Sequence, residues 1–140
     1  MIIQGKNEGA EAFLERRLAN HLNRYDVPRF FDMLAGMKLP RAKANLRKEL
    51  NGKTSKGYPD LNIPVPRRGF IGLFIELKAD GESPYLKDGV TPKKDKHTED
   101  QAEVHKYLRS FGHKVEFATG FKEAIKLIDW YLGKEDDNDS

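Results

Sequence analysis

The segment between residues 57 and 78 constrains the fold more than any other, because it has the pattern of a β-hairpin. A turn at residues 66–69 separates a first extended run, which follows Asp60, from a second one that ends at Lys78. Side chains at positions i and i+2 of a strand share a face, so Glu76 and Lys78 project together. The hairpin returns Glu76 towards Asp60. The sequence therefore predicts a sheet edge that carries two carboxylates and an ammonium group.

This set of side chains favours a hard cation beside a polarising lysine, which suits metal-dependent hydrolysis of a phosphodiester bond. Two structural alternatives remain open. Asp60 follows a proline, and Pro-Asp after a glycine is also ordinary turn chemistry. Glu76 lies in an apolar stretch, where an unpaired carboxylate would cost several kcal/mol, so it needs a cation. That cation could be a metal ion or, in a purely structural pair, Lys78.

The spacing resembles that of the PD-(D/E)XK nuclease superfamily, here Pro59-Asp60, then fifteen residues, then Glu76-Leu77-Lys78. The wider pattern is similar to one branch of it, the VRR-NUC (virus-type replication-repair nuclease) domain. The matching features are a glutamate at position 11 or 15, residues 57–61, residues 72–78, Gln101, residues 112–115 and residues 130–132. They span roughly residues 8 to 132, nearly the whole chain.

The resemblance implies an α/β fold of the restriction-endonuclease type, with a mixed sheet flanked by helices. It implies a Mg²⁺- or Mn²⁺-dependent DNA endonuclease of replication or repair, whose short stand-alone members are commonly encoded by phages. Such members resemble dimeric resolvases of branched DNA, so we expect a homodimer that cuts DNA of the Holliday-junction kind. An apolar cluster could supply the dimer interface or close the core instead; it comprises Phe30, Phe31, Met33, Leu34 and Met37.

The resemblance also assigns roles to single residues. The expected metal ligands are Asp60, Glu76, the Leu77 carbonyl and Glu15. Glu15 is preferred to Glu11 because its distance to the end of the helix fits better. Lys78 and Gln101 would orient and activate the attacking water. An equally good alternative for Gln101 is structural, because Thr98-x-x-Gln101 also reads as a capping box at the start of a helix.

Charge is distributed unevenly along a chain whose net charge is only +3. Residues 29–68 contain ten Lys or Arg against three acids, whereas the remainder has 15 basic and 19 acidic residues. A basic block beside a metal site is where a phosphate backbone would run. We expect the DNA contacts to come from Arg41, Lys43, Arg47, Lys48, Lys53 and Lys56. Taken alone, the same block could be a solvated helix face.

Length and composition limit the remaining possibilities. The 140 residues suffice for one domain, expected at 1–132, followed by an acidic, disordered tail at 133–140. No apolar run approaches the ~18 residues of a membrane span, and no secretory apolar region opens the sequence. The absence of Cys excludes disulfides and thiolate zinc sites. We therefore expect a cytoplasmic location without a membrane partner, within the bacterial host if a phage encodes the protein.

Hydrophobic periodicity predicts the other elements. Helices are expected at 8–24, 41–50, 98–111 and 121–132, and further strands at 29–33 and 114–118. The helix at 98–111 should make a parallel crossover between two strands, so that helices cover both faces of the sheet. The four histidines show no metal-ligand spacing and are expected on the surface.

Overall fold

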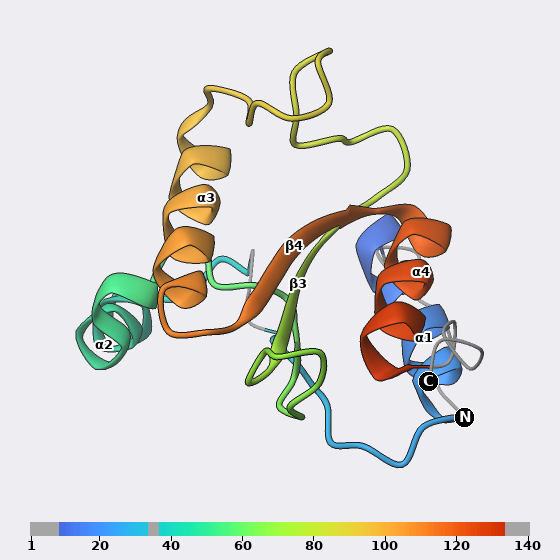
Figure 1. Cartoon of the computed structure of the whole chain (residues 1–140). Helices are drawn as coiled ribbons and strands as arrows, with labels where there is room; N and C mark the ends of the chain where they lie inside the picture. Colours follow the sequence, from blue (N-terminus) through green and yellow to red (C-terminus); the bar gives the residue numbers. More distant parts are fainter. Residues whose placement is uncertain (1–8, 34–36, 134–140) are drawn as a thin grey trace.

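The computed structural model describes residues 9–33 and 37–133, apart from the side chain of Glu11 (Figure 1). The elements are α1 (Ala10–Leu22), β1 (Phe30–Phe31), α2 (Arg41–Asn51), the short helix η1 (Gly52–Thr54), β2 (Leu61–Ile63), β3 (Leu73–Lys78), α3 (Lys96–Arg109), β4 (Lys114–Thr119) and α4 (Gly120–Leu132). Every predicted element is present. Leu34 and the acidic tail from residue 134 onward lie outside the described residues, and none of the described helices is long and apolar enough to cross a membrane.

The strands form one mixed sheet in the order β1-β2-β3-β4. β2 pairs antiparallel with β1 and with β3, whereas β3 and β4 are parallel. β3 therefore lies inside the sheet, and five of its six residues are buried. The mixed sheet confirms the predicted α/β fold class, and the parallel pair confirms the predicted crossover through α3.

A tight turn closes the tip of the β2–β3 hairpin. Arg67 and Phe70 exchange backbone hydrogen bonds of 3.1 and 2.8 Å. Between them, Arg68 and Gly69 have φ values of 52° and 84°. Two successive left-handed residues are typical of a type I′ turn, whose twist matches that of paired strands.

Alternation along β3 divides the core between the two faces of the sheet. Ile75 and Leu77 pack into one cluster with residues of α1 and α4. Phe74 points the other way and packs with Val104 and Leu108 of α3. Figure 1 shows the same layers, with α1 and α4 on one side of the strands and α3 on the other. Helices thus cover both faces, as predicted.

α2 stands apart from this core. None of its residues is buried, and its leucines at positions 46 and 50 are 46% and 73% exposed. Figure 1 places the helix beside one end of α3. Its apolar positions share a face, as the pattern predicts, but none of the described elements buries that face. The basic side chains of α2 therefore remain at the surface.

The loop before β2 approaches the second turn of α3 so closely that only glycine fits at position 57. A Cβ there would lie 2.7 Å from the backbone of Asp100 and Gln101, at a φ of +86°. Gly57→Ala should therefore lower the free energy of unfolding by the strain of a left-handed residue, about 1–2 kcal/mol. Overpacking against α3 should add about 1–3 kcal/mol to this loss of stability. Chemical denaturation measures the total.

Gly69→Ala is the matched control for this substitution. Gly69 has a nearly equal φ of +84°, but nothing lies within 4 Å of its added Cβ. It should show the strain alone. Equal losses in the two variants would mean that the loop can leave α3 at no cost.

Candidate active site

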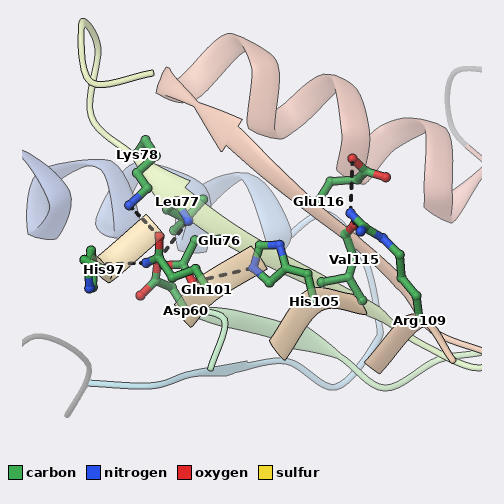
Figure 2. Close-up of polar contacts among 10 residues, drawn as sticks. All are labelled: Asp60, Glu76, Leu77, Lys78, His97, Gln101, His105, Arg109, Val115 and Glu116. Carbon is green, nitrogen blue, oxygen red and sulfur yellow. Dashed lines mark hydrogen bonds and ion pairs between the residues drawn. The ribbon is translucent and has the colours of Figure 1, made fainter. Parts of the chain in front are cut away.

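Two carboxylates lie side by side at the end of the hairpin. Asp60 immediately precedes β2, Glu76 lies in β3, and their exposed fractions are 5% and 4%. Leu61 pairs with Ile75, so one more step of the same register sets Asp60 opposite Glu76. Asp60 Oδ2 accepts a hydrogen bond of 2.8 Å from the Leu77 N–H (Figure 2). The hairpin thus brings together the two acids that the sequence predicts.

Lys78 and Gln101 complete this group from the α3 side of the sheet. Lys78 Nζ donates a hydrogen bond of 3.0 Å to Gln101 Oε1. The amide nitrogen of Gln101 lies 3.1 Å from His97 Nε2, one helical turn earlier in α3. Gln101 is only 3% exposed, so the two contacts hold its amide in one orientation. The ammonium group of Lys78 is therefore directed by a neutral acceptor beside the carboxylates (Figure 2).

The capping-box alternative for Gln101 is wrong. α3 begins at Lys96, and its N-cap is Asp95 rather than Thr98. The Asp95 carboxylate accepts from the Thr98 N–H at 2.9 Å and from the Thr98 hydroxyl at 3.0 Å. These bonds hold the pKa of Asp95 below its ordinary value. Because Asp95 already satisfies this end of the helix, the Gln101 side chain is available to Lys78.

His105 is a neighbour of the site that the sequence did not reveal, and the expectation that every histidine lies on the surface is wrong here. Its side chain is 1% exposed, and its Nε2 lies 3.8 Å from Glu76 Oε1. Burial, followed by the charges of Arg109 and Lys78, lowers the pKa of His105 to about 3. The ring is therefore neutral, and the contact is no ion pair. One signal was available: His105 follows Gln101 by four residues, which sets both on one helix face.

The acids, Lys78 and Gln101 line a cleft of about 530 Å³. Its basic lining residues are Arg47, Lys56, Lys78 and Lys96, together with His97. A neighbouring hollow of about 490 Å³ shares Lys56 with the cleft and adds Lys48 and Lys53. Arg47 also donates to Asp32 at 2.8 Å, which anchors α2 beside the cleft. Four of the six predicted DNA-contacting residues thus line the cleft or the hollow next to it.

The remaining two, Arg41 and Lys43, are exposed on α2. They line neither the cleft nor the neighbouring hollow. They share α2 with Arg47, which does line the cleft.

Glu15 is not among the residues that line the cleft. It is half-buried on α1, which packs against the face of β3 opposite to Glu76. Within residues 9–33 and 37–133, no group of three or more His, Cys, Asp or Glu side chains could hold a metal ion. The side chain of Glu11 lies outside the described residues. A carboxylate from α1 as a further ligand therefore stays a prediction.

The donor set at the hairpin nevertheless fits a hard divalent ion. Asp60 and Glu76 supply two nearly buried carboxylates, whose charge a cation would offset. The N–H and C=O of one strand residue point to the same neighbour. Because the Leu77 N–H is directed at Asp60, the Leu77 carbonyl faces the same edge. Oxygen atoms of this kind are the ligands that Mg²⁺ and Mn²⁺ prefer.

A mixed sheet flanked by helices, with two acids on its hairpin and a lysine after the second acid, is a restriction-endonuclease-like fold. A solved structure described as a "VRR_NUC domain protein" has a similar fold, with a TM-score of 0.61 and 23% sequence identity. The alignment covers 93% of this chain and 91% of that one. No protein-family model and no curated protein matches the sequence. The likeness confirms the predicted VRR-NUC fold.

Two substitutions at Asp60 should separate its structural role from its charge. Asp60→Ala removes the acceptor of the buried Leu77 N–H and should lower the free energy of unfolding by about 1–3 kcal/mol. Asp60→Asn keeps an oxygen acceptor for the Leu77 N–H and should therefore lose less stability than Asp60→Ala. Urea denaturation without divalent ions measures both. Equal stability of the two variants would mean that the Leu77 N–H finds another acceptor.

Proposed function

We propose that this chain is a Mg²⁺- or Mn²⁺-dependent DNA endonuclease that hydrolyses phosphodiester bonds. One observation carries the proposal: Asp60 and Glu76 are nearly buried on adjacent strands and share their cleft with Lys78 and Gln101. The rim of the same cleft is basic, as a phosphate backbone requires. The fold shared with a VRR_NUC domain protein agrees with this chemistry.

Each residue of the cleft has a distinct task in this proposal. Asp60, Glu76 and the Leu77 carbonyl hold the cation, with Glu15 as a further ligand if α1 supplies one. When bound, the cation acts as a Lewis acid towards the phosphate and lowers the pKa of a bound water. Lys78 stabilises the negative charge that develops on the scissile phosphate. Gln101 keeps Lys78 in place through its 3.0 Å hydrogen bond and orients the attacking water.

We further propose that the DNA is branched and that two copies of the chain act together. One active site cuts one strand, whereas the resolution of a four-way junction needs two symmetric cuts. Backbone and shape contacts from α2 would give little sequence specificity. Such an enzyme of replication or repair would work in the cytoplasm, including that of a phage-infected bacterium.

Active-site substitutions test the chemistry. Asp60→Asn and Glu76→Gln each remove an anionic ligand and should lower the cleavage rate at least ~100-fold, as should Lys78→Ala. The last variant should still bind the cation. The assay offers labelled linear, flap and four-way DNA, with Mg²⁺, Mn²⁺ or EDTA, and includes RNA of the same structures.

Glu99→Gln is the matched control, because Glu99 lies in the first turn of α3 outside the cleft lining. It should cut like the parent chain. Wild-type rates in all three active-site variants would reject the assigned site. DNA binding without any cleavage would favour the alternative of a non-catalytic binding module, and cleavage of RNA or of simple ends alone would change the substrate class.

The basic helix α2 should contribute to binding rather than to chemistry. Lys43→Ala with Lys48→Ala should weaken DNA binding and lower the slope of log affinity against log salt by about 0.9 per lost phosphate contact. Lys122→Ala with Lys126→Ala on α4, across the sheet, is the matched control. Fluorescence anisotropy at several salt concentrations measures both. An unchanged slope in the α2 variant would mean that this helix does not contact DNA.

The proposed homodimer makes a prediction about the apolar cluster before α2. Phe30, Met33 and Met37 are 67%, 80% and 57% exposed, whereas Phe31 packs against the core. Met33→Glu should therefore break a dimer without unfolding the chain, and junction cutting should fall while nicking of simple duplex remains. Val90→Glu, at a position that is 75% exposed in a loop, is the control. A monomer by light scattering at tens of micromolar with full junction cutting would rule the dimer out.

A further inference from the structure

His105 is a buried polar ring, and packing alone does not explain why a histidine occupies this position. It is 1% exposed, and its ring centroid lies 4.5 Å from that of Phe117. Both of its nitrogens are buried and have no hydrogen-bond partner among the residues that the structure describes. A buried N–H or nitrogen acceptor without a partner opposes folding. A phenylalanine would fill the same space without that cost.

The polar atom that the ring faces belongs to the candidate metal site. His105 Nε2 lies 3.8 Å from Glu76 Oε1, and Figure 2 shows the ring directed from α3 towards the carboxylate. The distance exceeds that of a hydrogen bond by less than 1 Å. Contacts in the active sites of ligand-free enzymes are often long and shorten when the ligands bind.

The neutral state of the ring suits this contact. Both ring nitrogens are buried and have no hydrogen-bond acceptor among the described residues, whereas an imidazolium would need one for each N–H. A neutral imidazole donates one N–H without bringing a positive charge. An imidazolium would compete with a metal ion for the charge of Glu76, whereas the neutral ring leaves that charge intact.

The helix that bears His105 is held at both ends, so the position of the ring is well defined. At the N-terminal end, the backbone of Gln101 lies against Gly57. At the C-terminal end, Arg109 donates to the Val115 carbonyl of β4 at 2.6 and 3.1 Å. α3 therefore sets the distance between His105 and Glu76.

We propose that His105 is a positioning residue of the metal site, whose Nε2–H binds Glu76 Oε1 and leaves the other carboxylate oxygen for the cation. The inference rests on the proposed function, because it gives a role to a residue that touches a metal ligand. Groups that orient a ligand in this way typically change metal affinity 10- to 100-fold when they are removed.

The tautomer of the wild-type ring provides a test that needs no variant. Long-range ¹H–¹⁵N NMR spectra of the full chain should show His105 with its proton on Nε2. The Nε2 signal should move when Mg²⁺ is added. A proton on Nδ1 would overturn the inference, because Nε2 could then only accept.

Calorimetric titration with Mn²⁺ provides the second test. His105→Phe keeps a ring but loses the donor, so the affinity should fall 10- to 100-fold. Without metal, its unfolding midpoint should equal or exceed that of the parent chain. His105→Gln offers an N–H in place of Nε2–H and should recover most of the affinity. His113→Gln, the same change at a half-buried histidine against Phe74, should leave it unaltered.

The outcomes separate this inference from the nuclease proposal. Unchanged Mn²⁺ affinity in His105→Phe, or a failure of His105→Gln to exceed it, would overturn the positioning role while metal-dependent cleavage stands. A wild-type chain that binds neither Mn²⁺ nor Mg²⁺ would overturn both.

Discussion

The pairing register of the β2–β3 hairpin determines which side chains enter the core and which form the candidate site. The antiparallel pairing of β2 with β3, in which Leu61 lies opposite Ile75, sets Asp60 opposite Glu76. A slip of one residue would move every side chain of β3 to the other face and set Glu76 among the leucines that pack against α1 and α4. The register of these two strands therefore fixes the core and the candidate site at once, and neither can change without the other.

Two nearly buried carboxylates in a small domain must be balanced by their surroundings. The Leu77 N–H donates to Asp60, and the Lys78 ammonium lies on the same side of the sheet as Glu76, held by Gln101. These contacts reduce the cost of the buried charges without removing the room for a cation. α3 supplies Gln101, because its close contact with Gly57 holds the helix beside the hairpin.

Much of this arrangement could be predicted from the sequence, because alternation and turn residues are local signals. They gave the hairpin, the mixed sheet, and the grouping of Asp60, Glu76 and Lys78. The role of Gln101 stayed ambiguous between a capping box with Thr98 and a place in the site, because Thr98 is a good N-cap residue and only the folded helix shows that α3 begins after Asp95 instead. The burial of His105 and the exposure of α2 depend on which other elements pack against each helix. Periodicity predicts the apolar face of a helix but not the elements that cover it.

The central claim is that the hairpin carboxylates bind a divalent cation, and a crystal of the protein soaked in Mn²⁺ tests it most directly. An anomalous difference map should show one strong peak within bonding distance of Asp60, Glu76 and the Leu77 carbonyl. A second peak nearby would add a leaving-group ion and would identify any ligand from α1. A map with no peak at the hairpin under saturating Mn²⁺, or with a peak that these oxygens do not coordinate, would contradict the account.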